Sequence, residues 1–231
     1  MVAGAEPIRH LILATVVLGL SVPVPTLAAG DRAGTGTGRE GQPVRSLLEM
    51  RRDKVVVQDW DLSCGAAALA TLLAYQHGDS VPERKVAKGM IRREEYLADP
   101  SRVQKGGGFS LLDLKRYVDR RGYEGVGYGQ LAFEHLIEFA PIIVPLSLNG
   151  YDHFVVFRGI WGDRVLLADP AWGNRVMSVE GFEDAWLDFP EFGKVGFVVQ
   201  RRDGAEPPNQ LAPKPGDFLI SPPSIVRTAS R

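Results

Sequence analysis

Strand-like segments dominate the second half of the chain, and this pattern constrains the fold more than any other feature. These segments are rich in β-branched and aromatic residues and span 142–148, 153–160, 164–169, 174–179 and 194–201. A short helix is expected between them near 180–186, whereas strong helix formers lie earlier, above all in 64–77. Helices first and strands later, with short connections, predict an α+β fold in which N-terminal helices pack on a C-terminal antiparallel sheet.

The only cysteine of the 231 residues, Cys64, begins the strongest of the expected helices. A helix N-terminus lowers the pKa of a thiol because its field favours the thiolate, and its free amides can bind an oxyanion. Gln58 lies six residues earlier and can supply a second oxyanion donor. Taken alone, however, a single cysteine on an alanine-rich helix is more often a buried core residue.

Sorting the four histidines leaves one candidate for a base that acts with this cysteine. His10 lies in an expected targeting segment. His77 lies 13 residues beyond Cys64 on the same helix, which places the two about 20 Å apart. His135 is typical of the polar face of a short amphipathic helix. The remaining candidate is His153.

His153 opens the expected strand 153–160, and the following strand, 164–169, ends in Asp169. A tight turn at Trp161–Asp163 joins the two strands, so Asp169 returns to the neighbourhood of His153. A carboxylate in that position orients an imidazole and stabilises its charged form. The plain structural alternative for His153 is a buried histidine with a single hydrogen bond.

Three motifs follow one another in a fixed order: Gln58-x5-Cys64-Gly-Ala-Ala-Ala-Leu, Asp152-His153-Phe-Val-Val and Asp169-Pro-Ala-x-Gly. Together they resemble the C39 family of papain-like cysteine peptidases, which cut leader peptides after a double glycine. The resemblance implies a papain-like fold and one role for each of four residues: nucleophile Cys64, general base His153, orienting acid Asp169 and oxyanion donor Gln58. Residue 63 is Ser where many members carry an acid, a departure that does not touch the chemistry.

A narrower resemblance is to small periplasmic C39-like proteins encoded with functional-amyloid secretion systems. They share the segments Asp61-x-Ser-Cys-Gly and Gly108-Phe-Ser-Leu-Leu-Asp. This resemblance implies a peptidase that acts on an exported protein or leader peptide at Gly-Gly or similar small-residue sites. It also implies separate secretion-system partners, because we expect neither the membrane nor the ATP-binding domain of the family's export transporters here. Trp60 and Trp172 flank motif residues and are expected either to line a narrow glycine channel or simply to pack at its rim.

Two functions from other classes fit the same residues. One is a domain that binds a Gly-rich segment without cutting it, as an escort for an exported protein. The other is a transpeptidase or amidase that uses the same triad on a different acyl group. The intact set of four site residues disfavours the escort, since a pure binding domain needs none of them.

Composition excludes several kinds of site. The chain is 45% hydrophobic and 24% charged, as expected of one globular domain with a good core. Its net charge of −1 offers no basic surface for nucleic acid. One cysteine and four unclustered histidines favour neither a disulfide nor a metal site. The run Gly106–Gly108 lacks the Gly-Lys-Ser/Thr ending of a phosphate-binding loop, so we expect no cofactor.

Residues 1–28 have the features of a secretory signal peptide. Arg9 precedes an apolar core of ten residues, and small residues follow at a position suited to cleavage after Ala28. A retained membrane anchor is the alternative, which the short core and the prolines after it disfavour. We therefore expect a periplasmic protein without stable membrane insertion after cleavage.

The rest of the chain divides into three expected segments. Residues 29–43 are Gly-rich and lack apolar periodicity, which indicates a flexible linker. Residues 44–202 are expected to form the peptidase domain. Residues 203–231 are rich in Pro, Ser and Gln, which predicts a disordered tail.

Overall fold

The computed structural model describes residues 45–92, 98–99 and 108–219, all within one compact unit of residues 43–231. The expected signal peptide and linker, residues 1–43, lie outside the described residues. No helix in the described part of the chain is long and apolar enough to cross a membrane.

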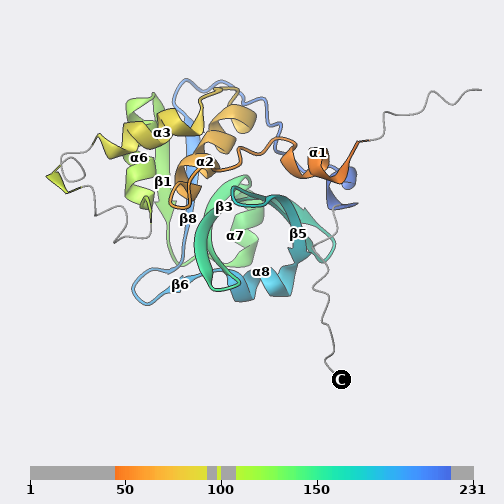
Figure 1. Ribbon diagram of the computed structural model, residues 1–231. Helices are drawn as coiled ribbons and strands as arrows, with labels where there is room; N and C mark the ends of the chain where they lie inside the picture. Colours follow the sequence, from red (N-terminus) through yellow and green to blue (C-terminus); the bar gives the residue numbers. More distant parts are fainter. Residues whose placement is uncertain (1–44, 93–97, 100–107, 220–231) are drawn as a thin grey trace, which may run out of the picture. The chain divides into compact units, whose positions relative to one another are not determined.

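Six strands form one antiparallel sheet in the order β1-β8-β2-β3-β4-β5 (Figure 1). Their bounds are β1 Tyr123–Tyr128, β2 Ile142–Leu148, β3 Tyr151–Trp161, β4 Arg164–Asp169, β5 Gly173–Ser178 and β8 Gly196–Arg201. A separate two-stranded ribbon pairs β6 Asp188–Phe189 with β7 Gly193–Lys194. The antiparallel sheet that we expected from the second half of the chain is confirmed, and consecutive hairpins build its β2-to-β5 part.

Helices cover both faces of this sheet. Their bounds are α1 Leu47–Arg52, α2 Cys64–Thr71, α3 Glu83–Ile91, α6 Leu111–Arg120, α7 Phe133–Phe139 and α8 Val179–Ala185. The helix α2 continues as a π-helical turn, η1 Leu72–Gln76. In Figure 1, α2 and α8 lie on opposite sides of β3, and two separate hydrophobic clusters fill the spaces between helices and sheet. The α+β arrangement is therefore confirmed. It has three layers, with the sheet between two layers of helices.

Strand alternation divides the apolar side chains between these two clusters. Ile143 and Val156 face α2, α3 and α6, whereas Val144, Val155 and Phe157 face α7 and α8. All five side chains are fully buried. Because β3 is apolar on both faces, it is held rigidly at the centre of the molecule, and a residue at its start has a fixed position.

The strand β1 is present in the structure, but we did not predict it from the sequence. Its two glycines, Gly125 and Gly127, lower the strand propensity of this segment. Packing explains the first of them, since a Cβ atom on Gly125 would lie 2.7 Å from side-chain atoms of Phe197 and Val118. The sheet gains this edge strand because β1 pairs with β8, a long-range contact that a local pattern does not report.

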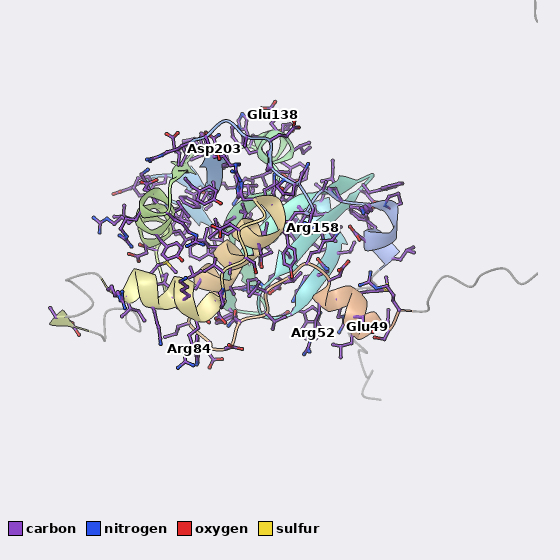
Figure 2. The ribbon with its side chains drawn as sticks, turned by 90° about the horizontal axis from the view of Figure 1, so that it is seen from above. Glu49, Arg52, Arg84, Glu138, Arg158 and Asp203 are labelled. Carbon is purple, nitrogen blue, oxygen red and sulfur yellow. The ribbon has the colours of Figure 1, made fainter. Side chains whose placement is uncertain are left out.

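The expected disorder of residues 203–231 requires correction, because residues 203–219 pack on the domain. Leu211 is fully buried, and its carbonyl oxygen accepts a hydrogen bond from Arg158 Nε at 2.9 Å. Asp217 lies 3.1 Å from Arg158 Nη2. Figure 2 shows Arg158 in the interior of the molecule. The tail has few apolar residues, but one buried leucine and polar partners for a buried arginine are enough to fix it. Residues 220–231 lie outside the described part.

The same arginine reaches the N-terminal helix through an asparagine. Arg158 Nη1 donates to Asn174 Oδ1 at 2.8 Å. Asn174 Nδ2 in turn donates to the carbonyl oxygens of Met50 and Asp53, at 3.1 and 2.7 Å. Segments from both ends of the domain are thereby tied to the β3–β5 part of the sheet.

Candidate active site

Cys64 is the first residue of α2, as we expected, and only 4% of its surface is exposed to solvent. The preceding residue, Ser63, uses its hydroxyl within its own turn, where Oγ donates to the Trp60 carbonyl at 2.7 Å. Ser63 therefore makes no side-chain hydrogen bond to the helix. The first amides of α2 have no side-chain cap and remain available to an oxygen atom in front of the helix.

Burial raises the pKa of the Cys64 thiol, which corrects our expectation that the helix end would lower it. The backbone N–H groups of Phe154 and Gly65 favour the thiolate but do not outweigh the loss of hydration, and the charge of Asp169 adds to the increase. The unliganded protein thus favours the protonated thiol. The contact with Phe154, the residue after His153, also places the thiol beside the start of β3.

His153 and Asp169 come together as the sequence predicted. They lie on the neighbouring strands β3 and β4, and His153 Nε2 is 3.2 Å from Asp169 Oδ1. Both side chains are buried, at 3% and 0% exposure. Since Nε2 faces the carboxylate, Nδ1 is the nitrogen that is left for proton exchange; it lies 3.4 Å from the Tyr151 carbonyl oxygen.

Asp169 is held in its ionised form by three partners. Burial acts to raise its pKa, but His153, Arg175 and the Ala171 N–H together bring the pKa below its usual value. Ala171 N donates to Oδ1 at 2.9 Å, and Arg175 Nη2 lies 3.2 Å from Oδ2 in an ion-pair contact without hydrogen-bond geometry. The glycine of this motif, Gly173, has a φ of +96°, and a side chain there would collide with the Arg51 carbonyl.

Gln58 is anchored beside this turn. Its backbone N–H donates to the Pro170 carbonyl at 2.8 Å, which ties the segment before α2 to the end of β4. Its side-chain Nε2 donates to the Trp60 carbonyl at 2.9 Å, while Oε1 is buried and has no hydrogen-bond partner among the described residues. A primary amide carries two N–H bonds, so Nε2 keeps a second hydrogen for another acceptor.

Two residues of the site were missed by sequence reasoning. Arg175 lies on β5 and pairs with Asp169. Tyr151 stacks its ring on the His153 ring, with 5.2 Å between centroids and an angle of 25° between planes. A signal for Tyr151 was present, because residues two apart on a strand point to the same face.

A pocket of about 320 Å³ opens beside Ser63, the residue before the thiol. Its lining is mostly apolar and comprises Trp60, Leu62, Ser63, Arg84, Ala87, Lys88, Ile91 and Phe109. Figure 2 shows Arg84 at the outer edge of α3. Trp60 thus forms a wall of a pocket near Cys64. Trp172 instead lies under Arg51, whose guanidinium carbon is 4.9 Å from the ring centroid.

The described residues contain no group of three His, Cys, Asp or Glu side chains that is placed to hold a metal ion. The site offers a thiol, an imidazole paired with a carboxylate, and uncapped helix amides. These groups suit acyl transfer through a covalent thioester intermediate.

Comparison with known proteins agrees with this chemistry. Residues 52–189 match the model of the Peptidase C39 family. The chain is 38% identical over 180 residues to the "probable functional amyloid protease FapD" of Pseudomonas aeruginosa, covering 77% of this chain and 76% of that one. It is also 38% identical over 143 residues to the protein of the same name from Pseudomonas fluorescens, covering 62% of this chain and 61% of that one.

A solved structure supports the fold. The peptidase domain of Streptococcus ComA, described as a bifunctional ABC transporter involved in a quorum-sensing pathway, superposes with a TM-score of 0.50. It is 17% identical, and the match covers 64% of this chain and 98% of that domain. The family model spans more than half of the chain, and the first relative covers three quarters of it at 38% identity. This chain belongs to the Peptidase C39 family of cysteine peptidases.

Proposed function

We propose that this protein is a cysteine endopeptidase that cuts an exported protein or leader peptide at Gly-Gly or similar small-residue sites. The observation that carries the proposal is the buried pair of His153 and Asp169 beside the uncapped end of the helix that begins with Cys64. The two FapD relatives are named as functional amyloid proteases, which supports a role in the biogenesis of amyloid fibres.

In the first step, the Cys64 thiol transfers its proton to His153 Nδ1, and Sγ attacks the carbonyl carbon of the scissile peptide. The Cys64 backbone N–H and the second N–H of Gln58 Nε2 donate to the oxyanion that forms. His153 then gives its proton to the leaving amine, and the carbon–nitrogen bond breaks. A water molecule attacks the thioester, passes a proton back through His153 and releases the acid and the free thiol.

The two pKa shifts fit this sequence of steps. A raised thiol pKa keeps Cys64 protonated until the imidazole accepts its proton. Asp169 has a lowered pKa, so it stays ionised and stabilises the imidazolium that results. The negative charge is therefore created at the moment of attack rather than stored on a buried sulfur.

The apolar pocket beside Ser63 is suited to an apolar side chain of the same substrate. Arg84 and Lys88 lie in its wall, where they suit a substrate segment that also carries carboxylates. The residues adjacent to the scissile bond would be glycines, as the family resemblance implies. Separate components of a secretion system would deliver the substrate.

Residues 1–28 indicate in which compartment this reaction would take place. A signal peptide cleaved after Ala28 would place the mature protein in the periplasm, where an exported substrate passes. The enzyme and its substrate would then meet only after export, which separates the peptidase from cytoplasmic proteins with exposed Gly-Gly sequences.

Cleavage of a Gly-Gly peptide tests the proposal. We expect the purified protein to cut the peptide, and Cys64→Ala and His153→Ala to lose turnover. His135→Ala is the matched control, since His135 is exposed on α7, where it accepts a hydrogen bond from Ala132 N at 2.9 Å. Capture of the peptide without hydrolysis by the wild-type protein would contradict the peptidase and support the escort function.

The substrate can be identified with the same variant. Cys64→Ala removes the nucleophile but leaves the pocket and the pair of His153 and Asp169 in place. Bound protein recovered from the periplasm with this variant, and absent with a variant that also carries Trp60→Ala, is the expected substrate. Mass spectrometry of that protein then gives the Gly-Gly segment to test.

A further inference from the structure

A second cavity lies at the far end of the helical segment that begins with Cys64. Its volume is about 470 Å³. Its lining comes from four segments, residues 76–77, 139–141, 198–201 and 204–207. His77 directly follows η1 and lies 13 residues beyond Cys64, which places the cavity roughly 20 Å from the thiol. Figure 2 shows Glu138 and Asp203, the neighbours of two of these segments, at one edge of the molecule. We call this cavity the β8 pocket.

The β8 pocket is lined by buried polar atoms that have no hydrogen-bond partner among the described residues. They are Nδ1 and Nε2 of His77 and Oε1 of Gln76. Only 5% of the His77 surface is exposed to solvent. Buried polar atoms almost always have a partner, so three of them around one cavity indicate a ligand that forms hydrogen bonds. The two residues lie at the end of a π-helical turn, a feature that is frequent at functional sites.

The ligand of such a pocket must both donate and accept hydrogen bonds. Burial lowers the pKa of His77 more than the nearby Val199 carbonyl raises it, so the ring is neutral. A neutral imidazole donates through one nitrogen and accepts through the other, and Gln76 Oε1 accepts. The charge of Arg201 is already paired, since its Nε donates to Asp203 Oδ1 at 2.9 Å. A peptide group carries one donor and one acceptor, and it suits this lining better than an ion of either sign.

The main chain of β8 supplies further hydrogen-bonding groups. Gly125 on β1 lies opposite Val199 on β8. The Gly125 carbonyl, however, accepts from Lys115 Nζ at 2.7 Å, and Gly125 N donates to Asp119 Oδ1 at 3.0 Å. Both main-chain groups of Gly125 thus face α6, so this pair is one of the non-hydrogen-bonded pairs of the antiparallel ladder. The N–H and C=O of Val199 therefore point away from β1, toward the β2 side of the strand.

Among the described strands, none occupies that side of Val199. In the described part of the chain, the ladder between β2 and β8 consists of one pair, Ile143 with Phe197. In this register the residue opposite Val199 is Pro141, which precedes β2 and has no N–H to donate. Pro141 and Val199 both line the β8 pocket. The pocket is therefore a gap in the sheet, where one side of β8 is left open beyond the start of β2.

We propose that the β8 pocket binds an extended peptide segment of a partner protein, which pairs with Val199 as a short added strand. The main chain of that segment bonds to the open N–H and C=O of β8, and its further polar groups bond to Gln76 and His77. Main-chain hydrogen bonds supply the affinity in this mode of recognition, so many sequences can bind. This inference goes beyond the proposed function, because the site holds a polypeptide roughly 20 Å from the thiol without cutting it.

Amide hydrogen exchange tests the open edge in the full-length protein alone. Val198 precedes Val199 and lies opposite Val126, and by the same alternation its N–H bonds to β1. We expect the Val199 amide of the free protein to exchange at least about 100-fold faster than the Val198 amide, because only the latter is held in the sheet. Equal protection of the two amides would show that the edge is closed and would overturn the proposal.

A peptide probe tests the binding itself. The pentapeptide Ac-Thr-Val-Thr-Val-Thr-NH2 is uncharged and favours an extended conformation, and it offers no glycine to the active site. We expect it to bind in titration calorimetry and to slow exchange of the Val199 amide at least about tenfold at saturation. The same peptide methylated at every main-chain nitrogen of its five residues cannot donate from them, and it should bind at least about tenfold more weakly.

Substitutions in the pocket test its location. Ala205 is an exposed lining residue, so Ala205→Trp should fill the mouth of the pocket without disturbing the fold. We expect this variant to lose at least about tenfold in affinity for the probe, since the added ring occupies the place of the peptide. His77→Ala should bind the probe several-fold more weakly, provided that its circular dichroism shows a folded protein. His135→Ala, at an exposed histidine on α7, is the matched control and should bind as the wild type does.

These measurements distinguish failure of this inference from failure of the peptidase, because none of them requires cleavage. A protein that cuts no peptide but binds the probe at Val199 leaves the inference standing. A fast Val199 amide without probe binding would mean that water alone fills the pocket, and that result overturns the proposal. Probe binding that is unchanged in Ala205→Trp would overturn its location. A concentration-dependent dimer that Ala205→Trp disrupts would identify the occupant as a second copy of this chain and overturn the assignment to a partner protein.

Discussion

Gln58 is the residue whose role can be separated most cleanly from that of the nucleophile. Gln58→Ala should slow kcat by about 100- to 1000-fold with little change in KM, because one oxyanion donor acts only as charge develops. Gln200→Ala, an exposed glutamine on β8, is the control and should match the wild type. Steady-state cleavage measures both. A Gln58→Ala enzyme with wild-type kcat would show that the oxyanion is held without this side chain.

Asp169→Asn should fall between Gln58→Ala and an inactive enzyme. Asparagine keeps the shape of the side chain but loses the charge that supports the imidazolium. It also lacks a charge to attract Arg175. Single-turnover rates on the same peptide rank the variants, and a wild-type rate for Asp169→Asn would exclude an electrostatic role for this carboxylate.

The contact of Arg175 with Asp169 leads us to expect that replacing Arg175 shifts the pH dependence of stability and activity. Because its positive charge helps to lower the pKa of Asp169, Arg175→Met should raise that pKa. The ionised contacts of Asp169 stabilise the fold above the unfolded value near ~3.9, and this contribution is lost as the pH falls through the lower, folded value. In Arg175→Met the loss should begin at a higher pH, whereas Arg175→Lys should resemble the wild type. Thermal unfolding and kcat/KM across acidic pH report it, and coincident profiles would refute it.

The sequence predicted the places of Cys64, His153 and Asp169 in the fold because each belongs to a short local pattern. Cys64 follows from helix formers, and His153 and Asp169 follow from two strands joined by a tight turn. The direction of the thiol pKa did not follow, because it depends on how tightly α2 packs against β3. The contribution of Arg175 is likewise a cross-strand contact with no local signature.

Arg158 holds the C-terminal segment on the sheet. Arg158→Met removes three donors and leaves the Leu211 carbonyl and Asn174 without their partner, which should cost about 3 kcal/mol. The expected fall in Tm is then about 6–12 °C for a domain of this size. Arg202→Met, which loses only an exposed contact at 3.6 Å with Asp119, is the control.

Limited proteolysis distinguishes local release of the C-terminal segment from general destabilisation of the domain. In Arg158→Met, residues near 205–217 should become the first site of cleavage at temperatures well below the Tm, because their anchor is gone. Equal protease resistance in the wild type and Arg158→Met would show that Leu211 alone holds the segment.

Expectations for the elements succeeded where apolar residues run together along the chain. The strands β2, β3 and β4 are such runs, and they are buried along most of their length. The strand β1 was missed because Gly125 is selected by a close approach to Phe197 rather than by strand propensity. The segment 203–219 was missed because its contacts are polar and distant in sequence.

For the whole molecule, the prediction concerns export. We expect mature protein that starts near Ala29 and fractionates with the periplasm, because residues 1–28 have a short apolar core followed by small residues. N-terminal sequencing of protein isolated from cells measures the start. Deletion of residues 11–20 should keep the protein in the cytoplasm and serves as the control. An intact Met1 in a membrane fraction would instead support a retained anchor.

The anchoring of Arg158 has a consequence for the order in which the molecule matures. A chain emerges from a ribosome or a translocation channel from its N-terminus, so β3 appears long before Leu211 and Asp217. Until those residues emerge, a guanidinium at the centre of the sheet lacks two of its partners and disfavours tight closure of the core. We therefore expect the strands that carry His153 and Asp169 to assemble fully only when these residues are free. The nascent enzyme would then pass through an interval in which it cannot yet cut what travels beside it.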